Sequence, residues 1–228
     1  MSESSQHFSE RREFDLSTLD ESSLNAVGND PWHFFEQWLT TARDAGLDDY
    51  NAMVLGTLAI DGAPDARVVL IRSIDDGEST GGLAKKSLSF FTNFHSEKGR
   101  QLAADPRCSV TFYWKELERQ VRMMGRAVPL PDAVCDAYFE SRPRGSQLGA
   151  WASIQSEDID SRSVLDKQLA EASARFEGRS VERPPHWGGY AFVPNSVEFW
   201  QGRPSRLHDR LRCVQSSDGA WGLKRLSP

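Results

Sequence analysis

The first segment with a clear pattern of apolar positions follows Asp30 and Pro31. Asp is favoured at the cap of a helix, and Pro fits the first helical position because no amide hydrogen is needed there. Apolar side chains then recur at helical spacing, at Trp32, Phe35, Leu39 and Ala42. Gly46 is typical of a helix end. The pattern predicts an amphipathic helix from Pro31 to about residue 45, with its aromatic face on the core.

Beyond this helix the apolar positions become strand-like, and we expect mostly antiparallel strands because the connections are short. The predicted strands cover residues 52–60, 67–73, 87–93, 108–114, 120–128, 189–200, 206–215 and 220–226. Asp61-Gly62 and Ser217-Asp218-Gly219 are hairpin turn signals. Further helices are predicted over residues 97–104 (with Ser96 as the cap), 129–141, 143–152 and 161–176. The chain therefore reads as mainly β with inserted helices, built on an antiparallel barrel.

The domain organisation follows from how the apolar residues are distributed. Residues 1–28 are rich in Ser, Glu and Asp and contain few apolar anchors, so we expect a flexible N-terminal segment. Residues 29–228 contain no internal repeat and no long linker, so they are interpreted as a single domain.

Composition then narrows the classes of function. The formal net charge of -6 argues against general nucleic-acid binding and against a polybasic membrane attachment. No apolar run is long enough to cross a bilayer, and the polar N-terminus lacks the apolar stretch of a secretory signal. The three cysteines, Cys108, Cys135 and Cys213, have neither a metal-ligand spacing nor a disulfide pattern. We therefore expect a cytoplasmic protein with no nucleic-acid or membrane partner.

The most informative cluster of polar residues lies near the C-terminus, after Trp200. Arg206, His208 and Arg210 alternate with other residues. If the segment is a strand, these three side chains share one face. A row of cationic donors is uncommon in a core, so the pattern predicts a pocket for an anionic, planar ligand.

Four further groups of polar residues could contact a ligand, the first three an anion and the fourth the edge of a heterocycle. They are Arg67 with Arg72, Ser96-Glu97-Lys98 at a helix start, the set Tyr138, Arg142 and Ser146, and the pair Gln155-Ser156. A helix N-terminus favours phosphate, and a phenol, a guanidinium and a hydroxyl can cradle one. The first three groups also have ordinary readings, as solvated strand ends, a capped helix and a helix C-terminus, and the signal of Gln155-Ser156 is weak on its own. No nucleophile elbow, phosphate-binding glycine loop or zinc-binding motif is present, and metal catalysis has no support.

Taken together, these segments resemble the pyridoxine (pyridoxamine) 5′-phosphate oxidase family in order and spacing. The matching stretches are RVVLIR at 67–72, FFTNFHSEKGRQL at 90–102, FYWKELERQVRMMGRA at 112–127, YFESRPRGSQLGAWAS at 138–153 and VEFWQGRPSRLHDRL at 197–211. The last two contain SRPR-x-SQ-x-GAW and FWQG-x-x-x-RLHDR, which are specific motifs. The resemblance covers nearly all of the chain from about residue 30.

The resemblance implies an FMN-binding split β-barrel homodimer that oxidises a phosphorylated B6 vitamer with O₂, giving pyridoxal 5′-phosphate and H₂O₂. The implied FMN contacts are Arg67, Val68, Phe91, Thr92, Lys98, Gln120, Gln155, Ser156, Trp200 and Arg210, some of them from the second subunit. The substrate phosphate would be bound by Arg72, Tyr138, Arg142 and Ser146. Arg206 and His208 would lie against the pyridine ring as the catalytic pair.

The sequence departs from the family pattern at three positions. Arg72 and Phe14 stand where Lys and Tyr are usual, and Glu97 stands where a second cation is often found. Two alternatives stay open. One is a related FMN-dependent oxidase of another aromatic substrate, as in phenazine biosynthesis, and the other is a non-catalytic flavin- or pyridoxal-phosphate-binding protein. Relatives of the phenazine type tend to lack the complete Tyr-Arg-Ser phosphate set.

Overall fold

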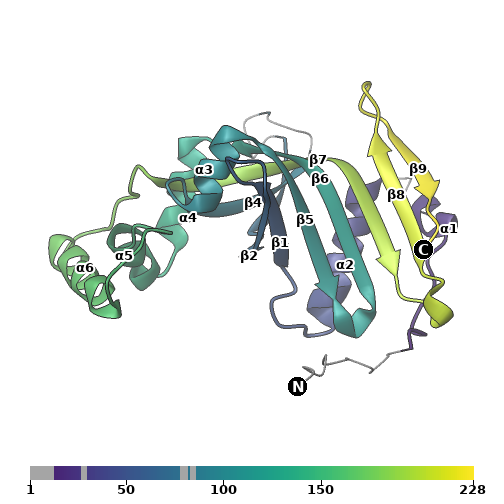
Figure 1. Ribbon diagram of the computed structural model, residues 1–228, viewed down its shortest axis with the longest axis horizontal. Coiled ribbons are helices and arrows are strands. Elements are labelled where there is room, and N and C mark those ends of the chain that lie inside the picture. Colours follow the sequence, from purple (N-terminus) through teal and green to yellow (C-terminus); the bar gives the residue numbers. More distant parts are fainter. Residues whose placement is uncertain (1–12, 27–29, 78–81, 83–85) are drawn as a thin grey trace, which may run out of the picture.

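The protein is built on one antiparallel sheet, seen in a computed structural model that describes residues 13–26, 30–77, 82 and 86–228. The hydrogen-bonded order is β2-β1-β5-β6-β7-β4-β3, with β8 added to β7 and β9 to β8. The strands are β1 (Ala52–Leu58), β2 (Pro64–Leu70), β3 (Ser73–Asp76), β4 (Lys86–Asn93), β5 (Arg107–Trp114), β6 (Arg119–Pro129), β7 (Trp187–Gln201), β8 (Asp209–Gln215) and β9 (Trp221–Arg225). Figure 1 shows that this sheet runs through the centre of the molecule.

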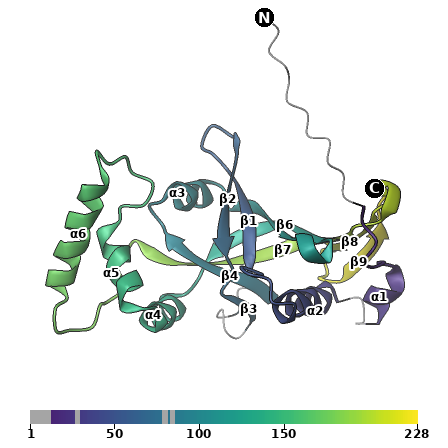
Figure 2. The same cartoon turned by 90° about the horizontal axis from the view of Figure 1, so that it is seen from below.

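The helices occupy the periphery of the sheet. They are α1 (Glu21–Asn25), α2 (Pro31–Asp44), α3 (Glu97–Ala104), α4 (Asp132–Ser141), α5 (Arg144–Ala152) and α6 (Arg162–Arg175), with 3₁₀ turns η1 (Lys115–Leu117) and η2 (Pro204–Arg206). In both views α4, α5 and α6 lie at one end of the molecule, and α1, β8 and β9 lie at the other (Figures 1 and 2). None of the helices in these described ranges is long and apolar enough to span a bilayer.

The core lies between α2 and the sheet. The predicted helix is confirmed, and the Asp30 carboxylate accepts the amide of Trp32 as its cap. The helix buries an aromatic face in which Phe35 meets Phe112 at 5.1 Å and Phe34 meets Phe199 edge-on at 4.9 Å. Edge and tilted contacts of this kind add to the free energy gained from apolar burial. This packing fixes α2 across the strands.

Strand β7 is long and runs from one end of the molecule to the other. Its first part pairs with β4, its whole length beyond residue 190 pairs with β6, and its last six residues pair with β8. The register with β6 shifts between Met124 and Gly125, which marks a bulge. The two ends of one strand therefore border two different regions.

The predicted mainly β, antiparallel architecture with inserted helices is confirmed. The strand β3 was not predicted, and two wrong strand boundaries misplace predicted site residues. The strand expected over residues 67–73 ends at Leu70, and Arg72 lies in the link to β3. Pairing explains this: the amide of Ile71 still bonds to Asn51, whereas the amide of Arg72 bonds to Ser89 on β4. The chain changes partners between these two residues.

The second correction concerns the cationic row. The strand begins at Asp209, so Arg206 and His208 precede it and do not share a strand face with Arg210. Pro204 begins a 3₁₀ turn, and both Ser205 and Arg206 have positive φ, at 57° and 62°. The chain therefore bends back before β8 starts. We call residues 203–208 the hook.

The predicted N-terminal segment, 1–28, is described only in part, since residues 1–12, 27 and 28 lie outside the described residues. Residues 13–20, which we call the strap, belong to no helix or strand, and α1 follows them. Leu19 and Leu24 are buried. The predicted flexibility of this segment stays a prediction, as does the single-domain reading of residues 29–228.

Candidate functional site

Arg142 and Ser146 share a cavity of about 310 Å³ beside the bend that joins α4 and α5. The sequence explains the bend between these helices. Arg142 precedes Pro143, which disfavours helical backbone at Arg142, and its ψ is 146°. Helix α4 therefore ends, and α5 begins one residue beyond the proline. The cavity, which we call the α4–α5 pocket, is lined by Asn93, Arg142, Ser146, Gly149, Ala150, Ser153, Gln155 and Trp187.

Among the described residues, aromatic faces and not a carboxylate hold the Arg142 guanidinium. Its carbon lies 4.5 Å from the Trp187 ring centre and 5.4 Å from that of Phe139. Its Nη1 is buried without a hydrogen-bond partner among the described residues. Burial lowers the pKa of Arg142, and the nearby Arg72 lowers it further. A buried donor without an acceptor costs about 1–3 kcal/mol, so this site favours an anion.

Tyr138 lies beside this pocket in an aromatic stack. Its ring is 3.9 Å from the Phe91 ring at 17°, and Phe91 in turn lies 5.5 Å from Trp187. The predicted set Tyr138, Arg142 and Ser146 is therefore gathered around the α4–α5 bend. Arg72 is exposed, yet it lies close enough to act on the pKa of Arg142.

A chain of polar side chains leads from the pocket to the start of α3. The Lys98 ammonium donates to the Thr92 hydroxyl at 3.4 Å, and Thr92 donates to the Gln155 amide oxygen at 3.4 Å. Ser96 caps α3 as predicted, accepting the amide of Gly99 at 3.3 Å. Burial lowers the pKa of Lys98, and the positive charge of Arg67 adds to this effect. Two cations thus lie near a helix N-terminus, which is a suitable place for a phosphate.

Arg67 is the second of these cations. Its guanidinium contacts the Asp65 carboxylate and the Thr57 hydroxyl, and donates to the Gln101 amide oxygen at 3.1 Å. Val68, the next residue of β2, points to the opposite face and is 66% exposed. Ser156 follows Gln155 in a left-handed conformation, with φ at 71°.

The remaining predicted site residues form a second group at the other end of β7. Gln120, Trp200 and Arg210 are neighbours across β6, β7 and β8. Arg210 is already engaged, since it donates to one oxygen of Glu198 at 2.9 and 3.0 Å and to the carbonyl of Ser227 at 2.9 Å.

His208 lies over this row. Its ring centre is 4.7 Å from that of Trp200, and Phe14 of the strap meets both rings edge-on. The His208 Nδ1 accepts the amide of Arg203 at 3.1 Å, so in the neutral ring the proton is on Nε2. Burial lowers the pKa of His208, and the neighbouring Arg206 lowers it further. Both effects favour the neutral imidazole, in which the N–H donor is on the far side of the ring from Arg203.

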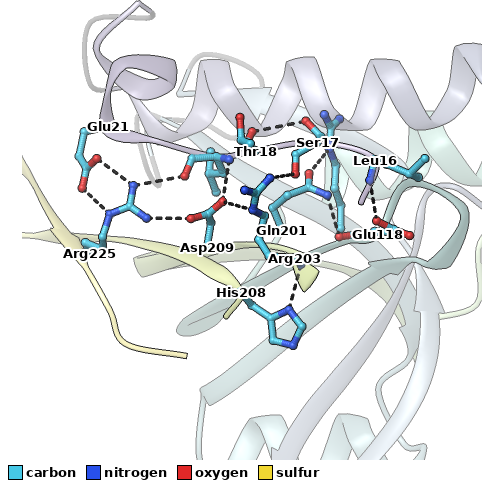
Figure 3. Close-up of polar contacts among 12 residues, drawn as sticks. Leu16, Ser17, Thr18, Glu21, Glu118, Gln201, Arg203, His208, Asp209 and Arg225 are labelled. Atoms are coloured by element: carbon cyan, nitrogen blue, oxygen red, sulfur yellow. Dashed lines mark hydrogen bonds and ion pairs between the residues drawn. The ribbon is translucent and has the colours of Figure 1, made fainter. Parts of the chain in front are cut away.

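The Phe14 ring lies where Gly202 has no side chain. A Cβ at this position would come within 2.6 Å of the ring, so only glycine fits beneath it. The sequence alone missed the acidic partners of the strap. Asp209 and Glu118 bind strap amides, and Arg203 and Arg225 bind strap carbonyls (Figure 3). In the sequence, the only indication of a role was that Asp209 follows His208 and that Glu118 lies in a predicted turn.

One chain does not bring the two groups together. The α4–α5 pocket and Lys98 belong to the end with α3, α4 and α5, whereas the hook lies beside β8 and α1 in both views (Figures 1 and 2). Among the described residues there is also no group of three His, Cys, Asp or Glu side chains that could hold a metal ion.

Comparison with known families gives matches over most of the chain. Residues 39–176 match the family described as pyridoxamine 5′-phosphate oxidase. Residues 187–228 match the pyridoxine 5′-phosphate oxidase C-terminal dimerisation region. The chain is 47% identical to the pyridoxine/pyridoxamine 5′-phosphate oxidase of Cupriavidus pinatubonensis, over 96% of this chain and 97% of that protein. It is also 47% identical to the protein of the same name from Burkholderia lata, with the same coverage of both chains.

Two solved structures share the fold. The crystal structure of PhzG from Burkholderia lata, in complex with tetrahydrophenazine-1-carboxylic acid, has a TM-score of 0.82 and 30% identity, and covers 93% of this chain and 99% of that one. A pyridoxamine 5′-phosphate oxidase-related, FMN-binding protein from Nostoc punctiforme has a TM-score of 0.68 and 16% identity, covering 87% and 98%. These likenesses confirm the predicted split-barrel fold.

Proposed function

The chain belongs to the pyridoxamine 5′-phosphate oxidase family, and from this premise we propose that it is an FMN-dependent oxidase of phosphorylated B6 vitamers. It converts pyridoxine 5′-phosphate or pyridoxamine 5′-phosphate to pyridoxal 5′-phosphate, with O₂ as the electron acceptor and H₂O₂ as the second product. The observation that carries the proposal is Arg142, a half-buried residue whose Nη1 is buried and has no acceptor among the described residues. A substrate phosphate supplies that acceptor.

The residues near Lys98 fit the phosphate of FMN. Burial and the charge of Arg67 both disfavour the Lys98 cation, so a bound anion at this point relieves both effects. Arg67, Lys98 and the N-terminus of α3 would hold the phosphate. The other residues proposed to contact FMN are Val68, Phe91, Thr92, Gln120, Gln155, Ser156, Trp200 and Arg210. When bound, FMN supplies the hydride acceptor that no side chain can provide.

The substrate would be held at both of its ends. Arg142, Ser146, Tyr138 and Arg72 bind its phosphate, and Arg206 and His208 lie against its ring. His208 would present an Nε2–H donor, because its Nδ1 is already occupied by the amide of Arg203. Fixing both ends orders the reacting carbon, which is an effect of proximity.

A homodimer would complete the site, because one chain keeps the α4–α5 pocket and the hook apart. In a twofold dimer, the hook of one protomer can face the pocket of its partner. The outer face of the sheet supports this proposal. Val68, Val54, Tyr113 and Met124 are between 43% and 66% exposed on it. Such a run of large apolar side chains is typical of a covered surface.

Phenazine biosynthesis is the alternative that a specific observation favours, since PhzG shares the fold at 30% identity. We favour the B6 reaction for two reasons. The identity to proteins named as B6 oxidases is 47%, and Arg142 and Ser146 share a polar pocket that suits a phosphate. A phenazine precursor with only a carboxylate would leave part of that set unused.

Oxygen uptake by the FMN-loaded protein tests the proposal. We expect turnover with pyridoxine 5′-phosphate and pyridoxamine 5′-phosphate, and at least about tenfold lower kcat/KM with unphosphorylated pyridoxine. Equal rates with and without the phosphate would contradict the role of Arg142. Absence of turnover with FMN bound would favour the non-catalytic reading, and turnover of a phenazine precursor alone would favour the PhzG-like reading.

A further inference from the structure

The strap belongs to no sheet, and its backbone groups form hydrogen bonds with side chains of the rest of the protein. The amide of Leu16 donates to Glu118 at 3.2 Å, and the amide of Leu19 donates to Asp209 at 3.0 Å. Arg203 donates to the carbonyl of Ser17 at 3.1 Å. Figure 3 shows these partners arranged along the strap, above His208. An isolated stretch of backbone is therefore fixed at several points to the region that carries the hook.

Asp209 is the centre of this arrangement. Its Oδ1 accepts from Arg225 at 3.0 Å, while its Oδ2 accepts the amide of Leu19 and lies 3.5 Å from the Nε of Arg203. The side chain is only 20% exposed, so these charges are partly shielded from water. One carboxylate thus joins the strap, the hook and the end of β9 (Figure 3).

The hook needs such support because its backbone is strained. Ser205 and Arg206 both have positive φ, which is unfavourable for residues with a Cβ and persists only where the surroundings impose it. Arg203 and Asp209 stand at the two ends of this bend, and their ion pair closes it. Inside the bend, the amide of Arg203 reaches the Nδ1 of His208 at 3.1 Å. The ends of the hook therefore determine where His208 and Arg206 point.

We propose that Asp209 is a positioning residue, which holds Arg203 and the strap together so that the hook presents Arg206 and His208 to the ring of the substrate. The inference rests on the proposed function, because it assigns Asp209 to the ring end of the same site. It differs from a purely structural role, in which Asp209 would affect only thermal stability.

Steady-state kinetics of Asp209→Asn in the FMN-loaded protein are the first test. The substitution keeps the size and one acceptor for the Leu19 amide, but it removes both ion pairs. We expect kcat to fall by at least about tenfold, because small displacements of reacting groups have effects of this size. KM for the phosphorylated substrate should stay within about twofold, since the α4–α5 pocket is unchanged.

Glu21→Gln is the matched control. Glu21 bonds to Arg225 at 2.7 and 2.8 Å, so the change removes an ion pair of the same network without touching the hook. We expect its kcat to equal that of the wild type. An unchanged kcat in Asp209→Asn, or the same loss in Glu21→Gln, would overturn the proposal.

Nitrogen NMR of the histidine rings gives a second readout that does not need activity. In the wild type the His208 Nδ1 should show the shift of an unprotonated acceptor, and in Asp209→Asn this signal should move toward a mixture of tautomers. An unchanged His208 signal would also overturn the proposal. If Asp209→Asn fails to fold, Arg203→Gln tests the same ion pair by both measurements. Should the wild type oxidise no B6 vitamer, the proposed function falls, and the spectra still decide whether Asp209 holds the hook.

Discussion

The α4–α5 pocket and the hook differ in whether their charged side chains have partners within the protein. In the pocket, Arg142 is held by the faces of Trp187 and Phe139, and its Nη1 finds no acceptor among the described residues. In the hook, Arg203 and the neighbouring Asp209 are saturated by each other, by the strap and by Arg225. The pocket leaves a buried donor unpaired, whereas Arg203 of the hook is paired within the protein.

The difference also appears in the backbone. The pocket stands between two regular helices whose bend is dictated by a proline, while the hook contains two residues with positive φ. A regular scaffold suits a group whose task is affinity, and a strained loop that is fixed at both ends suits one whose task is orientation. Substitutions in the pocket should therefore act mainly on KM, and those around the hook mainly on kcat.

The largest effect is expected from Arg142→Ala. Losing the charge-assisted bonds to the phosphate should lower kcat/KM by roughly 100-fold, mostly through KM. Arg142→Lys keeps the charge but not the paired donors, and should recover part of the loss. The measurement is the rate of oxygen uptake across substrate concentrations. With unphosphorylated pyridoxine the difference between wild type and variant should nearly vanish; a loss of equal size there would mean that Arg142 does not serve the phosphate.

Mixing two inactive variants tests whether pocket and hook meet across a dimer. At a substrate concentration below the wild-type KM, Arg142→Ala and Arg206→Ala homodimers should each be nearly inactive. After subunit exchange, half of the dimers carry one intact site, so about a quarter of the wild-type activity should return. The control is the same mixture held without exchange. Activity that stays at the level of the separate variants after proven exchange would mean that each site lies within one chain.

Lys98→Met separates affinity for FMN from stability. Removing the cation should raise the dissociation constant of FMN by about tenfold. Because burial disfavours the charge of Lys98, the FMN-free variant should be no less stable than the wild type. Fluorescence titration and thermal melting measure the two quantities. A drop in melting temperature without a change in FMN affinity would place the phosphate elsewhere.

The smallest effect is expected at Glu97, which is exposed in the first turn of α3. Its charge opposes a nearby phosphate, so Glu97→Gln should tighten FMN by about twofold at low salt and less at high salt. Glu171→Gln on α6 removes another exposed carboxylate and serves as the control. A weakening of FMN binding by Glu97→Gln would show that this carboxylate supports the site.

The sequence predicted those parts of the fold that local signals control. Helix α3 has the predicted bounds, 97–104, because Ser96 caps it and Asp105-Pro106 ends it. The grouping of Tyr138, Arg142 and Ser146 was expected from their spacing of four residues, and the bend that Pro143 imposes at Arg142 is a local effect that the sequence also contains.

The hook could not be predicted in this way. The alternation of Arg206, His208 and Arg210 is also that of a strand, and positive φ at Ser205 and Arg206 has no signature in residues other than glycine. Arg72 was misplaced for a related reason, because the change of partner strand after Ile71 depends on pairing with β4, a contact distant in sequence. In both cases the backbone conformation depends on contacts with residues distant in the sequence.

The length of strand β7 fixes the distance between the α4–α5 pocket and the hook. Trp187 at its start supports Arg142, and Trp200, thirteen residues later, packs on His208, so the strand sets these points about 40 Å apart. Two extra residues in this strand would leave every side chain on its own face, yet they would displace one end by about 7 Å. If the site is completed across a twofold dimer as proposed, such a protein would fold normally while the two halves of the site miss each other. An insertion in β7 would therefore abolish activity by changing the distance between the two parts of the site, even where each chain still folds.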